Sequence, residues 1–504
     1  MFKSITIKRS LTNIENLFVS HSKPGTKVAT RPLTRFNNIF NGRNQIGSSL
    51  YSTATAQSNM SFPCIDKIES RQVELKKSLK LQEDLFTHVV NGYETFHYKK
   101  PFAMSHGGIL PSFKIAYETW GELNSTKTNA ILIHTGLSAS SHAKSGEKNT
   151  KPGWWENFIG PGLSIDTNKY FVICTNLLGG CYGSTGPSSI NELTGKRYAS
   201  SFPIITINDM VRAQFLLLDN LGISKLHASV GASIGGMQSL AAAVIFPERV
   251  GKLVSISACA ISHPYSVSLR FAQRQVLMTD PNFNRGNYYD SVPPHVGMKL
   301  ARVISTVSYR SGPEWEMRFG RSRLSPDSDP ALCPDFLVET YLDHKGEKFC
   351  LEYDANSLLY ISKAADMFDV SESMTKKLSS KLNIAQRKIM AMESNSDNSV
   401  IDVCGFPNPA ELKSKNNKNN ETKIQIEEDL IAGVKNVMMP TLVLGVQSDI
   451  LFPSEQQKEI ATILRKAGNQ SVTYYELDSL YGHDTFLLDL VNVGAAIKGH
   501  LEHN

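Results

Sequence analysis

Short runs of apolar, often β-branched residues recur along the chain, and most of them end in glycine or another turn residue. Six of these runs predict β-strands: residues 129–136, 169–176, 226–231, 252–258, 440–446 and 472–477. Apolar residues fill the runs almost without alternation, which is typical of parallel strands buried on both faces. Between several of the runs, apolar residues recur at helical spacing, as over 207–222 and 236–250. The pattern predicts an α/β architecture with a mostly parallel sheet.

The strand pattern stops after Cys259 and resumes near Pro440. The intervening segment of about 180 residues shows mainly helical periodicity, for example over 295–311. We therefore predict a helical lid over residues 265–438, inserted between two strands of the sheet. Polar, asparagine-rich stretches near 391–424 predict a disordered surface insertion within it.

The pattern divides the chain into four parts. They are a leader over 1–60, a first part of the core over 61–264, the lid over 265–438 and a second part of the core over 439–504. A chain of 504 residues is long enough for one large domain with such an insertion.

The leader holds four lysines, four arginines and a single acid, and therefore carries a net charge of +7. The whole chain carries +6, so the remaining residues sum to about −1. Apolar residues at helical spacing between Ile7 and Phe18, together with few acids, are typical of a mitochondrial transit peptide. We expect a mitochondrial matrix protein; a basic tail without a targeting role is the alternative. The basic excess is confined to the leader, so no nucleic-acid partner is expected.

The composition is that of a soluble globular protein, with 41% hydrophobic and 20% charged residues. The chain contains no apolar run of about 18 residues, so no membrane span is expected. Seven cysteines are dispersed without a C-x-x-C pair. This distribution argues against a disulfide framework or a metal site, and it fits a reducing compartment.

Candidate chemistry begins with the stretch VGASIGGMQS, in which Gly231-x-Ser233-x-Gly235 follows a predicted strand. This is the pattern of a nucleophile elbow, although a match also arises by chance in chains of this length. A serine nucleophile needs a histidine base held by a carboxylate, and in α/β-hydrolases the three follow in the order Ser, acid, His. Asp449 and His483 follow the last two predicted strands in that order.

Taken alone, Asp449 could be a solvated loop acid and His483 an ordinary histidine. Together with Ser233 they satisfy one geometric plan at three independent positions, and we predict a catalytic triad. The oxyanion hole should combine the amide of Ile234 with that of Leu137, in the loop that follows the predicted strand 129–136. No Rossmann or Walker A pattern opens a helix, so nucleotide-driven chemistry is not indicated.

In the stretches around these residues, the chain resembles the homoserine/serine O-acyltransferases of the α/β-hydrolase superfamily. The resemblance rests on GASIGGMQSLAAA around Ser233 and on further ordered motifs. These motifs are GWWENFIGPG (153–162), TNLLGGCYGSTGPSS (175–189), RFGR (318–321), the stretch 341–369, SDILFP (448–453) and GHDTFL (482–487). The resemblance implies ping-pong transfer of an acyl group from acyl-CoA to an amino-acid hydroxyl, through an acyl-enzyme on Ser233.

The resemblance also implies partners and further site residues. Succinyl-CoA or acetyl-CoA would be a co-substrate rather than a bound cofactor, L-serine or L-homoserine would be the acceptor, and a homodimer through the lid would be possible. By position, Arg302 matches the arginine that grips the acceptor carboxylate, and Asp484 matches the acid that faces the acceptor ammonium. The alternatives are a surface helix charge for Arg302 and a helix-capping residue for Asp484.

One departure separates this chain from the homoserine enzymes of the family, which typically read HALTG where this chain reads HTGLSAS. With the mitochondrial-type leader, this variant is similar to the fungal branch that acylates serine for cysteine biosynthesis. Succinyl transfer to serine is therefore favoured. A homoserine O-acetyltransferase for methionine biosynthesis, an esterase or thioesterase, and an inactive hydrolase scaffold remain alternatives.

Overall fold

The computed structural model describes residues 63–78, 86, 89–330, 332–394 and 423–503. All described residues belong to one compact unit, residues 61–504. The predicted transit peptide, and the predicted insertion apart from its two ends, lie outside the described residues.

The core is an eight-stranded sheet with the strand order β1-β4-β8-β5-β9-β10-β11-β12. Its strands are β1 (Glu94–Tyr98), β4 (Phe113–Trp120), β5 (Ala130–His134), β8 (Phe171–Thr175), β9 (Ala228–Ala232), β10 (Leu253–Ile256), β11 (Thr441–Val446) and β12 (Val472–Leu477). The six predicted strands are all present and pair in parallel from β8 to β12. Only β1 and β4, at one edge, pair antiparallel. The predicted α/β fold with a mostly parallel sheet is confirmed.

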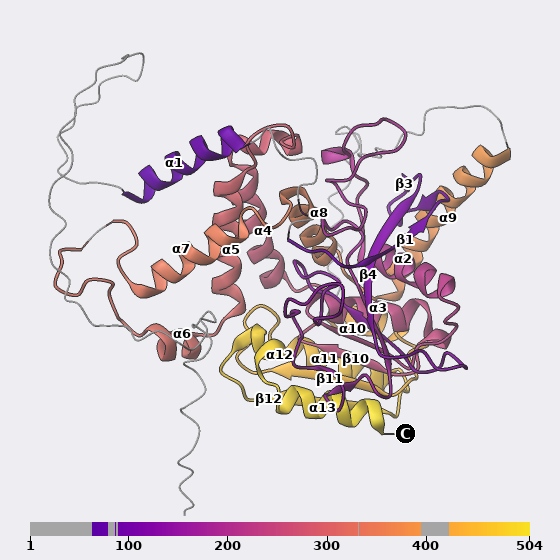
Figure 1. The fold of residues 1–504 in the computed structure, drawn as a ribbon. Coiled ribbons are helices and arrows are strands. Elements are labelled where there is room, and N and C mark those ends of the chain that lie inside the picture. Colours follow the sequence, from indigo (N-terminus) through magenta and orange to yellow (C-terminus); the bar gives the residue numbers. More distant parts are fainter. Residues whose placement is uncertain (1–62, 79–85, 87–88, 331, 395–422, 504) are drawn as a thin grey trace, which may run out of the picture. The chain divides into compact units, whose positions relative to one another are not determined.

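Helices cover both faces of this sheet (Figure 1). Side chains of one strand alternate between two apolar clusters: Leu132 of β5 packs on one face, whereas Ile131 and Ile133 pack on the other. The first face is covered by α2 (Ile207–Asn220), α3 (Ile234–Ile245) and α11 (Ser454–Lys466), and the second by α13 (Asn492–Glu502). Burial on both faces explains why the strands are almost continuously apolar.

The segment between the adjacent strands β10 and β11 is helical. Its helices are α4 (Pro264–Met278), α5 (His295–Tyr309), α6 (Gly312–Phe319), α7 (Leu337–Phe349), α8 (Ala355–Asp366), α9 (Glu372–Ser394) and α10 (Lys423–Gly433). The helix α5 packs on both α4 and α7, whereas α9 contacts β2 (Phe102–Ala103) and α10 contacts α11. Figure 1 shows this separation, with α9 on the side of the sheet opposite to α7.

The helix α1 (Pro63–Ser78) is joined to the helical segment by a disulfide between Cys64 and Cys333. An ion pair of 2.9 Å between Lys67 and Asp343 supports the same contact. The expectation that dispersed cysteines form no disulfide is wrong for this pair, because a separation of 269 residues gives no local pattern. Four further described cysteines are free and buried: Cys174, Cys181, Cys259 and Cys350.

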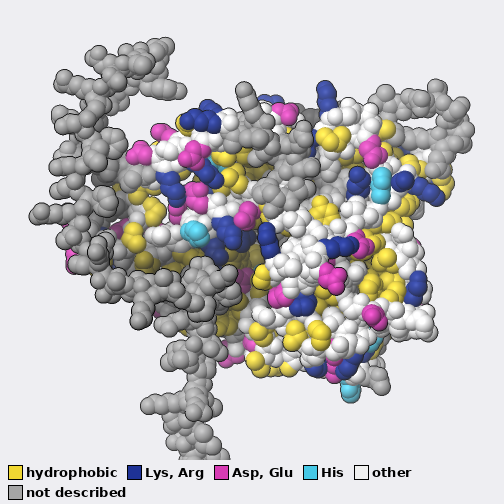
Figure 2. Space-filling model, viewed as in Figure 1, with side chains coloured by type: hydrophobic (Ala, Val, Ile, Leu, Met, Phe, Trp, Pro, Cys, Tyr) yellow, Lys and Arg dark blue, Asp and Glu magenta, His cyan; other side chains and the backbone are white. Residues whose placement is uncertain are grey.

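The described surface mixes charges of both signs. Figure 2 shows lysine, arginine and acidic side chains interspersed over the visible face, with apolar side chains between them. Among the described helices, none is both long and apolar enough to cross a membrane. The remaining short strands form two pairs, β2 with β3 (Ile109–Leu110) and β6 (Ile159–Gly160) with β7 (Ile165–Asp166).

Candidate active site

Ser233 lies at a sharp turn between β9 and α3. Its backbone has φ 59° and ψ −128°, a positive-φ conformation that costs a non-glycine residue about 1–3 kcal/mol. The turn requires glycine at its flanks. A Cβ on Gly231 would overlap the carbonyl of Gly235, and a Cβ on Gly235 would overlap the carbonyl of His134. The turn holds Ser233 at the carboxyl end of the sheet, where it lines a cavity.

Asp449 and His483 form a buried, hydrogen-bonded pair at the same end of the sheet. Asp449 follows β11 and His483 follows β12, which are neighbouring parallel strands. His483 Nδ1 lies 2.7 Å from Asp449 Oδ2. The other oxygen, Asp449 Oδ1, accepts hydrogen bonds from the backbone N–H groups of Leu451 and Phe452. These contacts fix the carboxylate, which in turn orients the imidazole.

The surroundings of His483 suit a proton acceptor. Burial by itself would lower the pKa of the imidazole, but the charge and hydrogen bond of Asp449 outweigh burial and raise the pKa above that of an ordinary histidine. His483 Nε2 has no hydrogen-bond partner among the described residues. The ring is held by Phe452 and Phe486, with centroid distances of 5.2 and 5.6 Å. The Asp449 bond selects the tautomer that leaves Nε2 free to accept a proton.

The 153–162 motif supports the segment that carries His483. Trp155 is buried, and its indole N–H donates to the carbonyl of Phe486 at 2.9 Å. Glu156 accepts hydrogen bonds from the backbone amides of Ser145 and Gly153, which ties the loop after β5 to the same motif. The loops of β5 and β12 are therefore braced by one short stretch of sequence.

Two residues that line the cavity have free backbone amides. The Ile234 amide lies in the first turn of α3, where no earlier helical carbonyl is available. The Leu137 amide lies in the loop after β5, and the Leu137 carbonyl accepts from the Tyr353 hydroxyl at 2.8 Å. Neither amide donates a hydrogen bond to another described residue. Amides of this kind can stabilise a developing oxyanion.

The cavity beside Ser233 has a volume of about 320 Å³. Loops after β5, β9, β11 and β12 form one side, and the helices α4, α5 and α7 form the other. The helical segment contributes Arg270, Gln273, Arg302, Ser305, Ser308, Tyr309, Arg310 and Lys345. The site therefore lies between the sheet and the inserted helices, where a bound ligand would be shielded from water.

The cavity holds both a cation and an acid suited to a zwitterionic ligand. The Arg302 guanidinium lies over the rings of Phe349 and Tyr309, with centroid distances of 4.7 and 5.4 Å. Burial raises the pKa of Asp484 to about 6, although the positive charge of Arg310 opposes this rise. Arg310 lies 3.6 Å from Asp484. Arg302 and Asp484 thus place a cation and an acid in the wall of the same cavity.

The structure brings the residues predicted from the sequence together. Six of them line the cavity: Leu137, Ser233, Ile234, Arg302, His483 and Asp484. Asp449 is not among the lining residues but is hydrogen-bonded to His483. Arg310 and Lys345 were missed. The spacing of Arg302, Ser305 and Tyr309 on one helix face could have indicated a cavity-lining stripe, but no local pattern marks Lys345.

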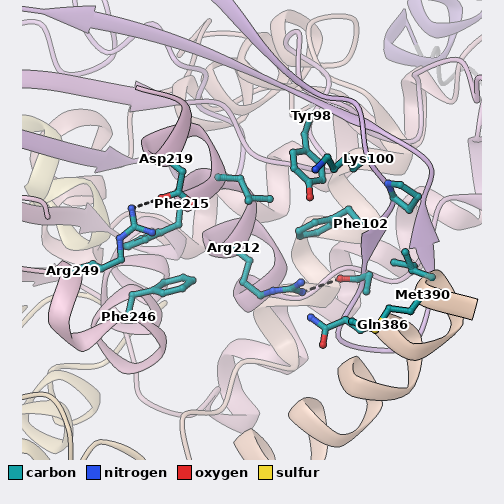
Figure 3. A pocket seen from close by; sticks show the side chains of 14 residues that line it. Tyr98, Lys100, Phe102, Arg212, Phe215, Asp219, Phe246, Arg249, Gln386 and Met390 are labelled. Atoms are coloured by element: carbon teal, nitrogen blue, oxygen red, sulfur yellow. Dashed lines mark hydrogen bonds and ion pairs between the residues drawn. The ribbon is translucent and has the colours of Figure 1, made fainter. Parts of the chain in front are cut away.

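A second, larger cavity of about 480 Å³ lies between α2, β2 and α9. Figure 3 shows that its arginines are already engaged. Arg249 lies 2.7 Å from Asp219, and Arg212 donates to the carbonyl of Ala103 at 2.9 Å. No serine, cysteine or histidine is among its described lining residues, so it has no counterpart of Ser233 and His483.

A strained serine at a strand-to-helix turn, with a hydrogen-bonded acid–histidine pair after later strands, defines a protein of the α/β-hydrolase class. In agreement, the family model for the alpha/beta hydrolase fold matches residues 129–490. A solved homoserine O-acetyltransferase from Bacillus anthracis has a TM-score of 0.65 at 26% identity, covering 82% of this chain and 98% of that one. A solved esterase shares the fold as well.

Comparison with curated relatives shows which family within this class the chain belongs to. The chain is 57% identical to a serine O-succinyltransferase of Emericella nidulans over 88% of both chains. It is 53% identical to a serine O-succinyltransferase of Schizosaccharomyces pombe, over 88% of this chain and 95% of the relative. The chain belongs to the family of serine O-succinyltransferases and homoserine O-acetyltransferases, and it is an acyltransferase.

Proposed function

We propose that this acyltransferase moves a succinyl group from succinyl-CoA to the hydroxyl of L-serine, through a covalent ester on Ser233. The observation that carries the proposal is the cavity in which Ser233, His483, Arg302 and Asp484 meet, in a chain with close relatives named for serine succinylation. The product ester turns the serine hydroxyl into a good leaving group. Such an ester suits a later replacement by sulfur, as cysteine biosynthesis requires.

In the first half-reaction, Ser233 Oγ attacks the thioester carbonyl carbon while His483 Nε2 takes the hydroxyl proton. The amides of Leu137 and Ile234 stabilise the oxyanion that forms. The C–S bond then breaks, and the proton on His483 passes to the departing sulfur. Free CoA leaves, and the acyl group remains on Ser233.

In the second half-reaction, the serine hydroxyl of the acceptor attacks the acyl-enzyme carbonyl, and His483 takes its proton. The bond to Ser233 Oγ breaks, and the same proton returns to Ser233. Arg302 binds the acceptor carboxylate in a bidentate manner, and Asp484 binds its ammonium. Placement of the acceptor under the inserted helices excludes water, which would otherwise hydrolyse the ester.

The lid surface supports a homodimer in which the helices α4 and α5 meet their counterparts. On α4, Phe271 and Met278 are exposed one heptad apart, and on α5 Leu300 and Val307 are exposed with the same spacing. Apolar stripes on adjacent helices form a surface suited to burial against a second copy. Light scattering of the purified protein tests this assembly. A monomeric mass at micromolar concentration would count against it.

We propose a mitochondrial matrix location on the basis of the basic, acid-poor leader. A fluorescent fusion of the full chain should enter mitochondria, and a fusion without residues 1–60 should not. Equal location of both fusions would contradict a targeting role for the leader.

The proposed function is tested by CoA release over two donors and two acceptors. Succinyl-CoA and acetyl-CoA are each combined with L-serine and L-homoserine, and the Ser233→Ala variant serves as the blank. Fastest turnover with succinyl-CoA and serine supports the proposal. A preference for homoserine would assign the enzyme to methionine synthesis, and CoA release independent of any acceptor would make it a thioesterase.

A further inference from the structure

Four cationic side chains line the cavity beside Ser233: Arg270, Arg302, Arg310 and Lys345. Two of them already form ion pairs with acids of the protein. Arg270 lies 2.6 Å from Asp366, and Arg310 pairs with Glu314. The other two form no ion pair with any described residue. The cavity therefore presents two cations that form no ion pair within the described part of the chain.

The packing of α7 explains why Lys345, whose Nζ lies 5.6 Å from the centroid of the Tyr341 ring, has no acidic partner among the described residues. The acids at the neighbouring positions, Asp343 and Glu347, both bind Lys299 of α5. Residues two apart on a helix lie on nearly opposite sides, so Lys345 is turned away from these acids and lines the cavity. Gly346 fixes the contact, because a Cβ there would lie 2.9 Å from the Lys299 carbonyl.

The electrostatic surroundings of Lys345 favour an anionic ligand. Burial lowers the pKa of this lysine, and the positive charges of Arg302 and Arg310 lower it further. No acid lies close enough to reverse these effects among the described residues. A carboxylate that entered the cavity would relieve this repulsion and would be bound with a charge-assisted hydrogen bond.

We propose that Lys345 binds the free carboxylate of the succinyl group and thereby makes the enzyme select succinyl-CoA over acetyl-CoA. This inference rests on the proposed function. It gives each charged group of the succinyl donor and of the acceptor amino acid a protein partner in the cavity. The acceptor carboxylate meets Arg302, the acceptor ammonium meets Asp484, and the donor carboxylate meets Lys345. An acetyl group has no carboxylate and leaves Lys345 unpaired.

The same contact assists the second half-reaction. Once Ser233 is succinylated, the cavity contains one carboxylate before the acceptor brings a second. Two such charges a few ångströms apart repel each other strongly in a site shielded from water. Lys345 and Arg302 together neutralise both carboxylates and allow the acceptor to bind beside the acyl-enzyme.

The test compares both donors with purified wild type, Lys345→Gln and Lys345→Arg, with L-serine as the acceptor. Lys345→Gln should lower kcat/KM for succinyl-CoA by about 10- to 100-fold, as expected when a hydrogen bond between charged groups is lost. The value for acetyl-CoA should change little. Lys345→Arg should retain most of the succinyl preference. Lys348→Gln removes an exposed charge from the same helix and should behave as wild type.

Three outcomes would overturn the inference. An equal loss with both donors at unchanged melting temperature would give Lys345 a role without donor selectivity. A higher KM for serine with either donor would assign Lys345 to the acceptor. An unchanged donor ratio would remove it from recognition. In the same assay, a wild type without activity toward succinyl-CoA overturns the proposed function itself, and is thereby distinguished from a failure of Lys345 alone.

Discussion

His483 Nδ1 lies 2.7 Å from Asp449 Oδ2, while His483 Nε2 has no partner among the described residues. The pair combines an oriented imidazole with a free lone pair in the cavity that Ser233 lines. Two backbone amides anchor the carboxylate, so its position does not depend on a bound substrate. This hydrogen bond joins the loops that follow β11 and β12 and orients His483 toward the cavity.

Asp449→Asn should lower kcat by about 10³- to 10⁴-fold with little change in KM, because an amide favours the wrong imidazole tautomer. Steady-state kinetics with succinyl-CoA and serine measures the loss. Asp478→Asn is the matched control, since Asp478 is exposed just after β12 and should leave kcat unchanged. A loss below tenfold in Asp449→Asn would contradict its role as the orienting acid.

The pH dependence of kcat/KM should show an acidic limb at higher pH than an ordinary histidine would give, because His483 must be neutral to accept a proton and Asp449 raises its pKa. Activity should rise as the pH increases through this limb. In Asp449→Asn the limb should move to lower pH, because the charge that raised the pKa is gone. A limb that stays in place in the variant would show that another group controls it.

Asp484→Asn should raise KM for serine by about 10-fold or more, since the acceptor ammonium loses its counter-charge. The same variant should be more stable than wild type at about pH 8, by about 1–3 kcal/mol. The sign follows from the raised pKa of about 6 in the folded state. Ionisation of the buried acid costs stability as the pH rises from about 4 to 6, and asparagine avoids this cost.

Urea unfolding at about pH 4 and pH 8 measures the difference between Asp484→Asn and wild type. The difference in the free energy of unfolding should be small at about pH 4 and should reach its full value at about pH 8. A variant less stable than wild type at the higher pH would mean that the pairing of Asp484 with Arg310 outweighs the burial of the acid.

Gly235→Ala should abolish activity and destabilise the fold by about 3 kcal/mol or more, because the added methyl overlaps the carbonyl of His134. Gly312→Ala is the control. A Cβ at Gly312 meets nothing within 4 Å, and its effect on unfolding should be small. Equal stability of both variants would show that the turn around Ser233 can relax.

Much of the core can be predicted from the sequence, because parallel strands that are buried on both faces consist of continuous apolar runs. Ser233, Asp449 and His483 each follow such a strand, so their meeting was predictable from strand order. The strands β1 and β4 were missed because they are only partly buried, and they form the antiparallel end of the sheet.

Other features depend on tertiary packing, which no local pattern reveals. Lys345 reaches the cavity because α7 approaches α5 closely at Gly346. The Cys64–Cys333 bond joins segments 269 residues apart. Arg310 lies within the stretch 295–311 that was predicted to be helical, but its pairing with Asp484 depends on how the end of α5 meets the loop after β12.

The most direct test of the account is the covalent intermediate. Wild-type enzyme is mixed with succinyl-CoA in the absence of an acceptor, and intact-mass and peptide-mass measurements follow. We expect one succinyl group per chain on Ser233, a matching burst of free CoA, and loss of the group when L-serine is added. An unmodified enzyme that releases CoA only when serine is present, or a label on another residue, would contradict it.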